Sequence, residues 1–348
     1  MRADAYTAAA FLAGFLAGAG TGWAHHSFSA VYDAATVTEI EGIVTRVLWA
    51  NPHVRFTIKG KNERGRQGLW DVETNSVSIL RRMQISSNVL KIGDRTRVAG
   101  NPGRRGTLQM FAHNVLLPNG QEVLLQPGSV PRWSKQTIGK SDTWLASAGR
   151  ASDPSRGIFR VWSSSLSAPF LFPEDPKAIA SYRLTPAARA ALARFDPVGD
   201  APTRNCAPKG MPTIMEQPYP MEFVQQGGNI LLRLEEYDTL RTIRMSGVPG
   251  STSATPTLLG HSVGRWDGRT LVVTTTGVSW RHFDGVGVPL GSGATMVERF
   301  TPNAEGSRLD YELTVTDPAT FTRPVVLKKY WIWLPEITLS SYECTNER

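Results

Sequence analysis

The sequence predicts a mainly β protein made of two small barrels. Short stretches that alternate apolar and polar residues recur along the chain, and Gly, Pro and Asn separate them. Few stretches show the spacing of a helix. Because 348 residues exceed what one hydrophobic core usually serves, we expect about two domains.

The start of the chain has the features of a secretory signal peptide. Residues 7–20, TAAAFLAGFLAGAG, are too few for a membrane span, and Gly22 and Ala24 are small residues at positions −3 and −1 of a cleavage site. We therefore expect residues 1–24 to be removed. The mature chain has no later run of about 18 apolar residues, so we expect a periplasmic or secreted protein without a membrane span.

Residues 25–126 are expected to form the first barrel. Five or six strand-like stretches surround one stretch of helical spacing, NSVSILRRMQISSNVLKIGD at 75–94. This arrangement is typical of small barrels like the oligonucleotide/oligosaccharide-binding (OB) fold. That fold binds many kinds of ligand, so it predicts an architecture and no particular ligand.

Residues 127–205 are rich in Pro and Ser and are expected to connect the two domains. The one convincing element is a helix over 184–195, with Thr185 as its N-cap and Pro186 at its first helical position. Several aromatic side chains in this segment indicate that it lies along a domain surface.

Residues 206–348 are expected to form the second barrel. They contain eight or nine successive strand-like stretches, and Asp267-Gly268 between two of them is the strongest hairpin signal. The pattern predicts an antiparallel, lipocalin-like barrel wide enough for one small ligand, with a β-sandwich as the alternative.

Charge and cysteine content restrict the partners. The net charge is +8, but the basic residues are scattered in short groups, so we expect no nucleic-acid partner. The two cysteines, Cys206 and Cys344, are expected to form one disulfide in an oxidising compartment. No CxxC or Cys-His cluster indicates a metal-binding or catalytic thiol.

Four of the six histidines lie in the first domain and are candidate metal ligands: His25, His26, His53 and His113. A cut after Ala24 makes His25 the first residue, whose amine and imidazole can chelate one ion, and a cut after Gly22 also leaves a copper-binding terminus. Nitrogen donors without thiolates favour copper, with zinc next. The alternatives are a solvated His-His pair and ordinary hydrogen-bonded imidazoles in the fold. His113 is expected to share a face with Phe111 and Val115.

Polar residues of the second domain are candidates for a pocket. An acid–base site would use His261, His282 and Asp284, which lie beside glycines at loop positions, together with Glu235 or Glu298. A binding cavity would use Arg233, Tyr237 and Glu312 of strand faces and Arg265 of a loop position. Whether these faces point into the barrel or to solvent stays open at this point.

Several motifs resemble known exported bacterial sequences. HHSFSAVYD, EGIVTRVLWANPHVRF, WDVET, LKIGDRTRVAGNP and LLPNGQEVLL, within residues 25–126, are similar to an uncharacterised domain-of-unknown-function family with a His-His start and an Asn-Pro-His motif. PYPMEFVQ, LLGHSVGRWDGRTLVV and ERFTP resemble a second uncharacterised exported β domain. The resemblance implies export and a small β domain, and it assigns no activity.

Two kinds of function follow from the sequence, with a plain envelope interaction module as a third. The first is a binding protein that holds a small molecule in the second barrel and copper or zinc at the N-terminal histidines. The second is a periplasmic isomerase, dehydratase or hydrolase that uses the acid–base candidates of the second barrel.

Overall fold

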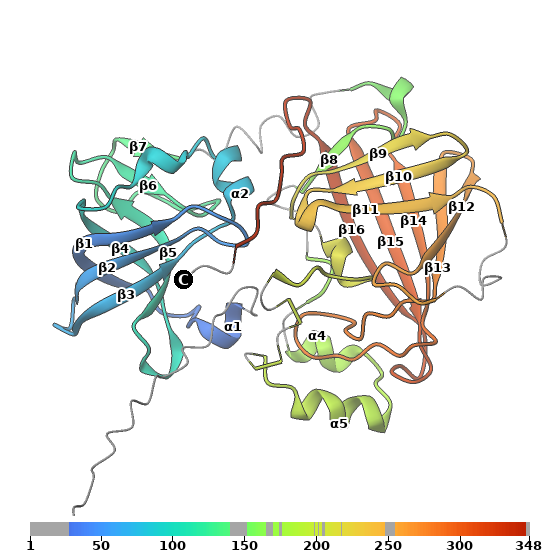
Figure 1. Cartoon of the computed structure of the whole chain (residues 1–348), viewed down its shortest axis with the longest axis horizontal. Helices are drawn as coiled ribbons and strands as arrows, with labels where there is room; N and C mark the ends of the chain where they lie inside the picture. The colour runs from blue at the N-terminus through green and yellow to red at the C-terminus, as the bar shows by residue number, and fades with distance from the viewer. Residues whose placement is uncertain are drawn as a thin grey trace, which may run out of the picture.

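The protein consists of two β-barrels that lie side by side, with short helices at their margins (Figure 1). The computed structural model describes residues 28–139, 152–164, 170–173, 176–197, 199–200, 202–203, 206–216, 218–247 and 255–345. The predicted signal peptide and the pair His25 and His26 lie outside these residues. No helix in the described part of the chain is long and apolar enough to cross a membrane.

The first barrel has five strands, and two short strands extend its sheet. The neighbours run β3-β2-β1-β4-β5, and β3 closes the ring by pairing with β5. The strands are β1 (Thr38–Leu48), β2 (Arg55–Asn62), β3 (Gln67–Glu73), β4 (Arg95–Pro102), β5 (Gln109–Leu116), β6 (Glu122–Leu124) and β7 (Thr137–Ile138). Neighbouring strands in a ring of five cannot all be antiparallel, and the one parallel pair is β3–β5.

Alternating burial explains why these residues form strands. Along β1 the apolar residues Ile40 and Val44 are 1% exposed, while Glu41 and Ile43 between them face outward. Gly42 of β1 faces Gly60 of β2, where a Cβ on Gly42 would lie 2.6 Å from the Gly60 Cα. A larger residue at this pair would force the two strands apart.

The second barrel is a closed ring of nine strands, in the order β10-β11-β12-β13-β14-β15-β16-β8-β9. They are β8 (Val161–Ser163), β9 (Met221–Gln226), β10 (Asn229–Leu234), β11 (Thr239–Arg244), β12 (His261–Asp267), β13 (Thr270–Thr276), β14 (Thr295–Pro302), β15 (Arg308–Thr316) and β16 (Val325–Trp333). The closed ring confirms the predicted barrel over the β-sandwich. Nine is again an odd number, and the parallel pair is β11–β12, which is joined only at Ile243–Ser262 and Arg244–Val263.

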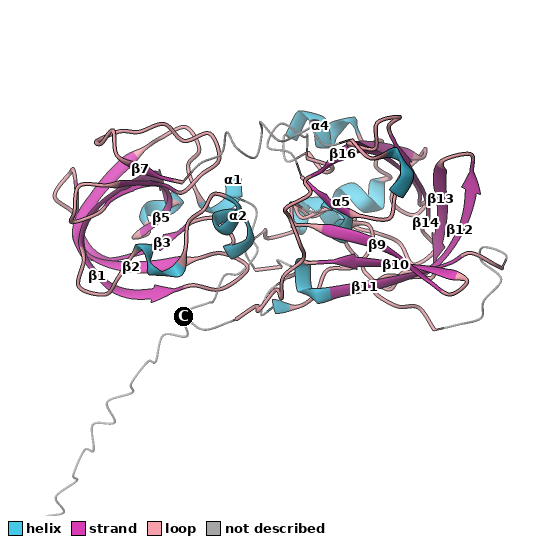
Figure 2. Cartoon of the chain, turned by 90° about the horizontal axis from the view of Figure 1, so that it is seen from above, coloured by secondary structure: helices cyan, strands magenta, loops and turns pink. Residues whose placement is uncertain are grey.

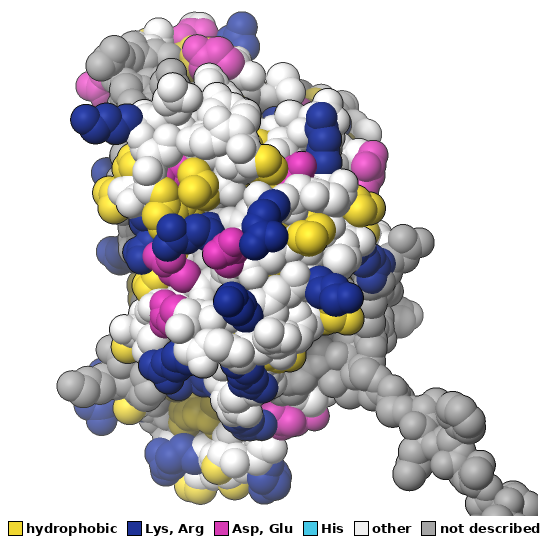
Figure 3. All heavy atoms as spheres, turned by 90° about the vertical axis from the view of Figure 1, so that its left-hand side faces the viewer, with side chains coloured by type: hydrophobic (Ala, Val, Ile, Leu, Met, Phe, Trp, Pro, Cys, Tyr) yellow, Lys and Arg dark blue, Asp and Glu magenta, His cyan; other side chains and the backbone are white. Residues whose placement is uncertain are grey.

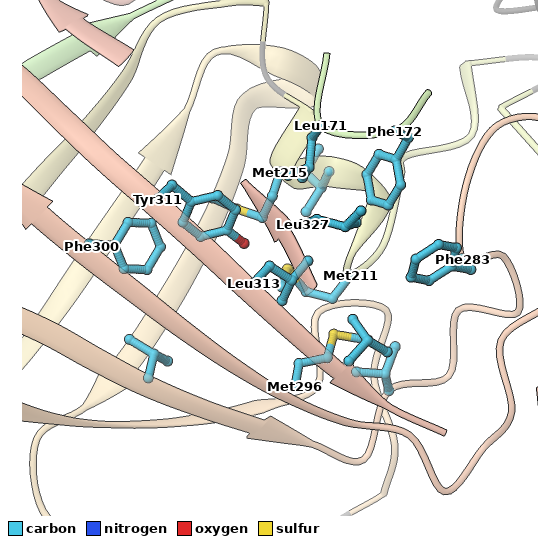
Figure 4. Close-up of a cluster of buried hydrophobic side chains, with 14 of the residues drawn as sticks. Leu171, Phe172, Met211, Met215, Phe283, Met296, Phe300, Tyr311, Leu313 and Leu327 are labelled. Carbon is cyan, nitrogen blue, oxygen red and sulfur yellow. The ribbon is translucent and has the colours of Figure 1, made fainter. Parts of the chain in front are cut away.

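Side chains fill the interior of the second barrel. The 3-10 turn η5 (Thr213–Glu216) carries Met215 into the core, where Met211 and Met215 are 0% exposed. Figure 4 shows Met215 beside Tyr311 and Leu313, which point inward from β15. The middle of the barrel is therefore a packed core.

The segment between the barrels is more ordered than a connector. The predicted helix is present as α5 (Pro186–Arg194), and the Thr185 side chain accepts a hydrogen bond from the Ala188 N–H (3.2 Å). The strand β8, which lies within the predicted connector, pairs with β16 and β9. The second barrel thus begins before residue 206. Two more short elements, η3 (Pro154–Arg156) and α4 (Pro176–Ser181), complete the segment.

One short helix of the first barrel docks on the second. Besides α1 (Phe28–Val31), η1 (Ser87–Val89) and η2 (Arg104–Gly106), the first barrel has α2 (Val77–Arg82). Arg82 donates to the Pro218 carbonyl (2.8 Å), and Arg81 lies 3.6 Å from Glu235. Burial lowers the pKa of Arg82 to about 10. Figure 2 shows α2 on the side of the first barrel that faces the second.

The C-terminal segment joins the two barrels. It passes from β16 to the first barrel (Figure 1), where Asn51 donates to the Tyr342 carbonyl and accepts from the Thr345 N–H (3.1 Å). Cys206 and Cys344 form the expected disulfide. The bridge holds this segment against the stretch between β8 and β9 that contains Cys206.

Replacing both cysteines with serine should destabilise the folded chain by at most about 5 kcal/mol, because the bridge closes a loop across a sequence separation of 138 residues. Guanidinium unfolding of the oxidised wild type and of the Cys206→Ser/Cys344→Ser variant measures the difference. Equal unfolding midpoints would show that the tail is held by its hydrogen bonds alone.

Candidate functional site

An aromatic cluster covers the outer side of the first barrel at its parallel junction. Phe28 of α1 packs edge-on against Phe111 of β5 with ring centroids 5.0 Å apart. Tyr32 lies 5.5 Å from both rings. The contacts fix the beginning of the described chain on the strand pair β3–β5.

His53 lies beside this cluster, with its ring centroid 6.3 Å from that of Phe111. Its Nδ1 is 2.8 Å from the Thr74 carbonyl oxygen, which can only accept a hydrogen bond. Nδ1 therefore carries the proton, and Nε2 is the nitrogen that carries the lone pair. The side chain is 30% exposed, so a ligand can reach it.

A buried carboxylate supports His53. Glu73 is 2% exposed, and its Oε1 lies 3.4 Å from His53 Nδ1. Its Oε2 accepts from the Tyr32 hydroxyl (3.0 Å), and Arg55 is 3.9 Å away. Burial and the neighbouring Glu73 raise the pKa of Tyr32 well above its usual range, so the phenol stays a donor. Histidines that bind metals commonly have such an outer partner.

His113 lies on the same strand as Phe111, two residues further on. Its Nε2 is 2.6 Å from Asn101 Oδ1, and the Asn101 amide nitrogen donates to three backbone carbonyls, for example that of Thr36 (2.8 Å). The amide oxygen is thus the acceptor, His113 Nε2 carries the proton, and Nδ1 has the free lone pair. Burial, and then Arg132, lower the pKa of His113. The imidazole is therefore more readily neutral than that of a solvent-exposed histidine.

The expectation that Val115 shares a face with His113 is wrong. The pairing of β4 and β5 shifts between Ala99 and Gly100, which face Asn114 and Ala112 respectively, so His113 is an extra residue in β5. This bulge keeps His113 on the outer side with Phe111 and turns Val115 into the core, where it is 2% exposed.

A surface pocket of about 530 Å³ lies next to His113. Phe28, Phe111 and Arg132 line it together with the backbone turn at 126–130. Within the described residues no group of three or more His, Cys, Asp or Glu side chains could hold a metal ion. A metal at this pocket would need further donors from outside the described chain.

Several basic side chains of the first barrel form ion pairs on its surface. Arg95 lies 3.0 Å from Glu41, and Arg132 lies 3.0 Å from Glu39. Figure 3 shows Lys and Arg side chains interspersed with acidic and hydrophobic ones on the exposed end of this barrel. These observations agree with a solvated surface.

The histidines of the second domain have partners on different segments. His261, the first residue of β12, donates from Nε2 to the Thr255 carbonyl (3.0 Å). His282 packs against Trp280 with centroids 5.0 Å apart, and burial lowers its pKa. Asp284 is 1% exposed, and its Oδ1 accepts from the N–H groups of Val286 (3.0 Å) and Val288 (2.9 Å). These contacts of Asp284 shape its own loop.

The two glutamates among the acid–base candidates are buried in the structure. Glu235 follows β10, accepts from the Ser340 N–H (2.9 Å) and faces Arg81, so it belongs to the contact with the tail and α2. Glu298 is 0% exposed inside the second barrel. It pairs there with Arg241 and accepts from the Tyr311 hydroxyl (3.0 Å).

The proposed ligand-binding strand residues lie mostly on the outside of the barrel. Arg233 pairs with Glu222 (2.9 Å), Glu312 pairs with Lys328 (2.8 Å), and Arg265 is exposed. Tyr237 follows β10 in a left-handed conformation (φ 58°) and packs on the tail residue Tyr342, with centroids 4.9 Å apart. The polar strand faces therefore point to solvent.

Two charged residues that face inward were absent from the sequence-based candidates. Arg241 of β11 bonds Glu298, Ser262 and Thr275. Lys329 of β16 is 6% exposed and lies 2.8 Å from Glu216 Oε1. Each residue occupies a position in its strand at which the alternation of apolar and polar residues predicts a side chain facing the core. That alternation is the sequence signal that could have revealed them.

Replacing Arg132 with Gln should raise the pKa of His113 toward 6.5, because one of its two lowering causes is removed while burial remains. NMR titration of the imidazole Cε1–H resonances measures this shift. The titration of His282 in the other barrel is the internal control, and an unchanged His113 would rule out the Arg132 interaction.

Replacing Glu298 with Gln should destabilise the second barrel by about 3–5 kcal/mol, because the Arg241 charge then stays buried without its partner. Chemical unfolding measures this change. The matched control is Glu312→Gln on the outer face, which should cause no measurable change. A neutral result for Glu298→Gln would show that water reaches Arg241.

Comparison of the chain with curated proteins and with solved structures finds no match. A family model matches the first part of the sequence. Residues 14–111, which include the His-His pair, His53 and the strands that hold Glu73 and Phe111, match a family described as a family of unknown function (DUF6152).

Proposed function

We propose that this chain is an exported protein that binds a transition-metal ion, copper in the first place and zinc next, at the aromatic cluster of its first barrel. The proposed ligands are the N-terminal histidines His25 and His26 together with His53 or His113. The packing of Phe28 on Phe111 carries this proposal.

Chain connectivity limits where the N-terminal histidines can lie. Consecutive Cα atoms are about 3.8 Å apart, so the three steps along the sequence from His25 to Phe28 can span at most about 11 Å. Phe28 packs on Phe111 of the strand that carries His113, and the ring of Phe111 lies 6.3 Å from that of His53. The short connection to Phe28 therefore allows His25 and His26 to supply ligands beside His53 and His113.

The donor set favours copper. The amine of a cleaved N-terminus and neutral imidazoles are nitrogen ligands, and Cu(II) binds them more tightly than other divalent first-row ions do. His53 Nε2 is oriented by the bond from Nδ1 to Thr74, and the lowered pKa of His113 reduces competition from protons. Both features support metal binding by His53 and His113, whose rings are held by hydrogen bonds within the first barrel.

Copper titration of the mature protein tests the proposal directly. A variant with three extra non-histidine residues before His25, which has no histidine among its first three residues, should bind Cu(II) at least about tenfold more weakly, because the terminal amine no longer chelates together with an imidazole. Competition with a chromogenic Cu(II) chelator at neutral pH measures the affinities. His53→Ala and His113→Ala, tested in the same way, identify which imidazole completes the site.

The matched control is His261→Ala in the second barrel, which should bind copper like the wild type. Equal affinities for the wild type, the extended variant and both first-barrel histidine variants would overturn the proposal. Mass spectrometry of protein purified from the periplasm establishes the true first residue before the titration.

A further inference from the structure

The second barrel has an opening where its two parallel strands separate. β11 pairs with β10 along Thr239–Arg244, but with β12 only at Ile243 and Arg244. Beside the first part of β11 lies a turn, in which the Gly260 N–H bonds the Thr257 carbonyl (3.1 Å). One edge of β11 from Leu240 to Thr242 therefore lines a pocket instead of pairing with β12.

This pocket has a volume of about 340 Å³, which is within the range of small-molecule sites. Leu240 and Leu259 give it apolar walls, and Leu240 is 60% exposed. Arg241 and Ser262 line it and are themselves 2% exposed. Arg244 and His261 lie at its rim, and no carboxylate is among the described residues that line it.

The buried residues of the pocket are rigid and already satisfied. Arg241 bonds Glu298 (2.9 Å), Thr275 (2.8 Å) and Ser262 (3.1 Å), so its charge is neutralised inside the barrel. The positive charge available to a ligand is that of Arg244. His261 Nε2 is held by the Thr255 carbonyl, which fixes the ring at the pocket rim.

We propose that this pocket binds a small amphipathic carboxylate, with the carboxylate on Arg244 and the apolar part against Leu240 and Leu259. A guanidinium recognises a carboxylate through two parallel hydrogen bonds, and the exposed leucine loses contact with water when the ligand binds. This site lies outside the packed interior and does not depend on the metal proposal.

Titration with octanoate, followed by NMR amide shifts and calorimetry, tests the inference on the full mature chain. Octanoate should bind saturably and shift the resonances of β11 and of the turn at 257–260, while octylamine should not. Arg244→Gln should weaken octanoate binding at least about tenfold, as expected for loss of a charged hydrogen-bond partner.

Arg269→Gln removes an equal charge at the exposed β12–β13 turn and should leave octanoate affinity unchanged. Leu240→Glu adds a negative charge to the apolar wall and should abolish binding without entering the core. Equal loss in Arg244→Gln and Arg269→Gln would mean that octanoate responds only to net charge. That result, equal binding of octylamine, or the absence of saturable shifts at β11 would overturn the proposal.

Discussion

The buried ion pair between Arg241 and Glu298 holds the second barrel together where its sheet is weakest. Arg241 stands on β11 and Glu298 on β14, and the bonds of Arg241 to Ser262 and Thr275 include β12 and β13 as well. Only two residue pairs join β11 to β12 through the backbone. Side-chain bonds therefore replace the missing backbone ladder across this junction, at the cost of burying two charges.

The same geometric constraint governs both barrels. A ring with an odd number of strands must contain a parallel pair, which is β3–β5 in the five-stranded barrel and β11–β12 in the nine-stranded one. Polar side chains gather at both junctions, Glu73 at the first and Arg241 at the second. Both proposed binding sites adjoin a parallel junction, and in the second barrel the short ladder there leaves a pocket.

Strand patterns predict most of the fold because strand residues here alternate between core and solvent. Thr185 caps its helix and the two cysteines form a disulfide, as their residue types predict. β8 is only three residues long and lies among Pro and Ser, so its pairing depends on distant strands that no local pattern reveals. The bulge at His113 and the inward charge of Arg241 are likewise tertiary features, fixed by Gly100 and Glu298 across the sheet. Glu298 was a sequence-based candidate, but its partner was not.

The Cys206–Cys344 bridge sets the order in which the molecule can be completed. Cys344 follows β16 in sequence, and its neighbours Tyr342 and Thr345 bond to Asn51 of the first barrel. The bridge and these bonds form only after the strands of both barrels have been synthesised. A chain that stops before Tyr342 lacks them all, so its two barrels are not fastened by the tail.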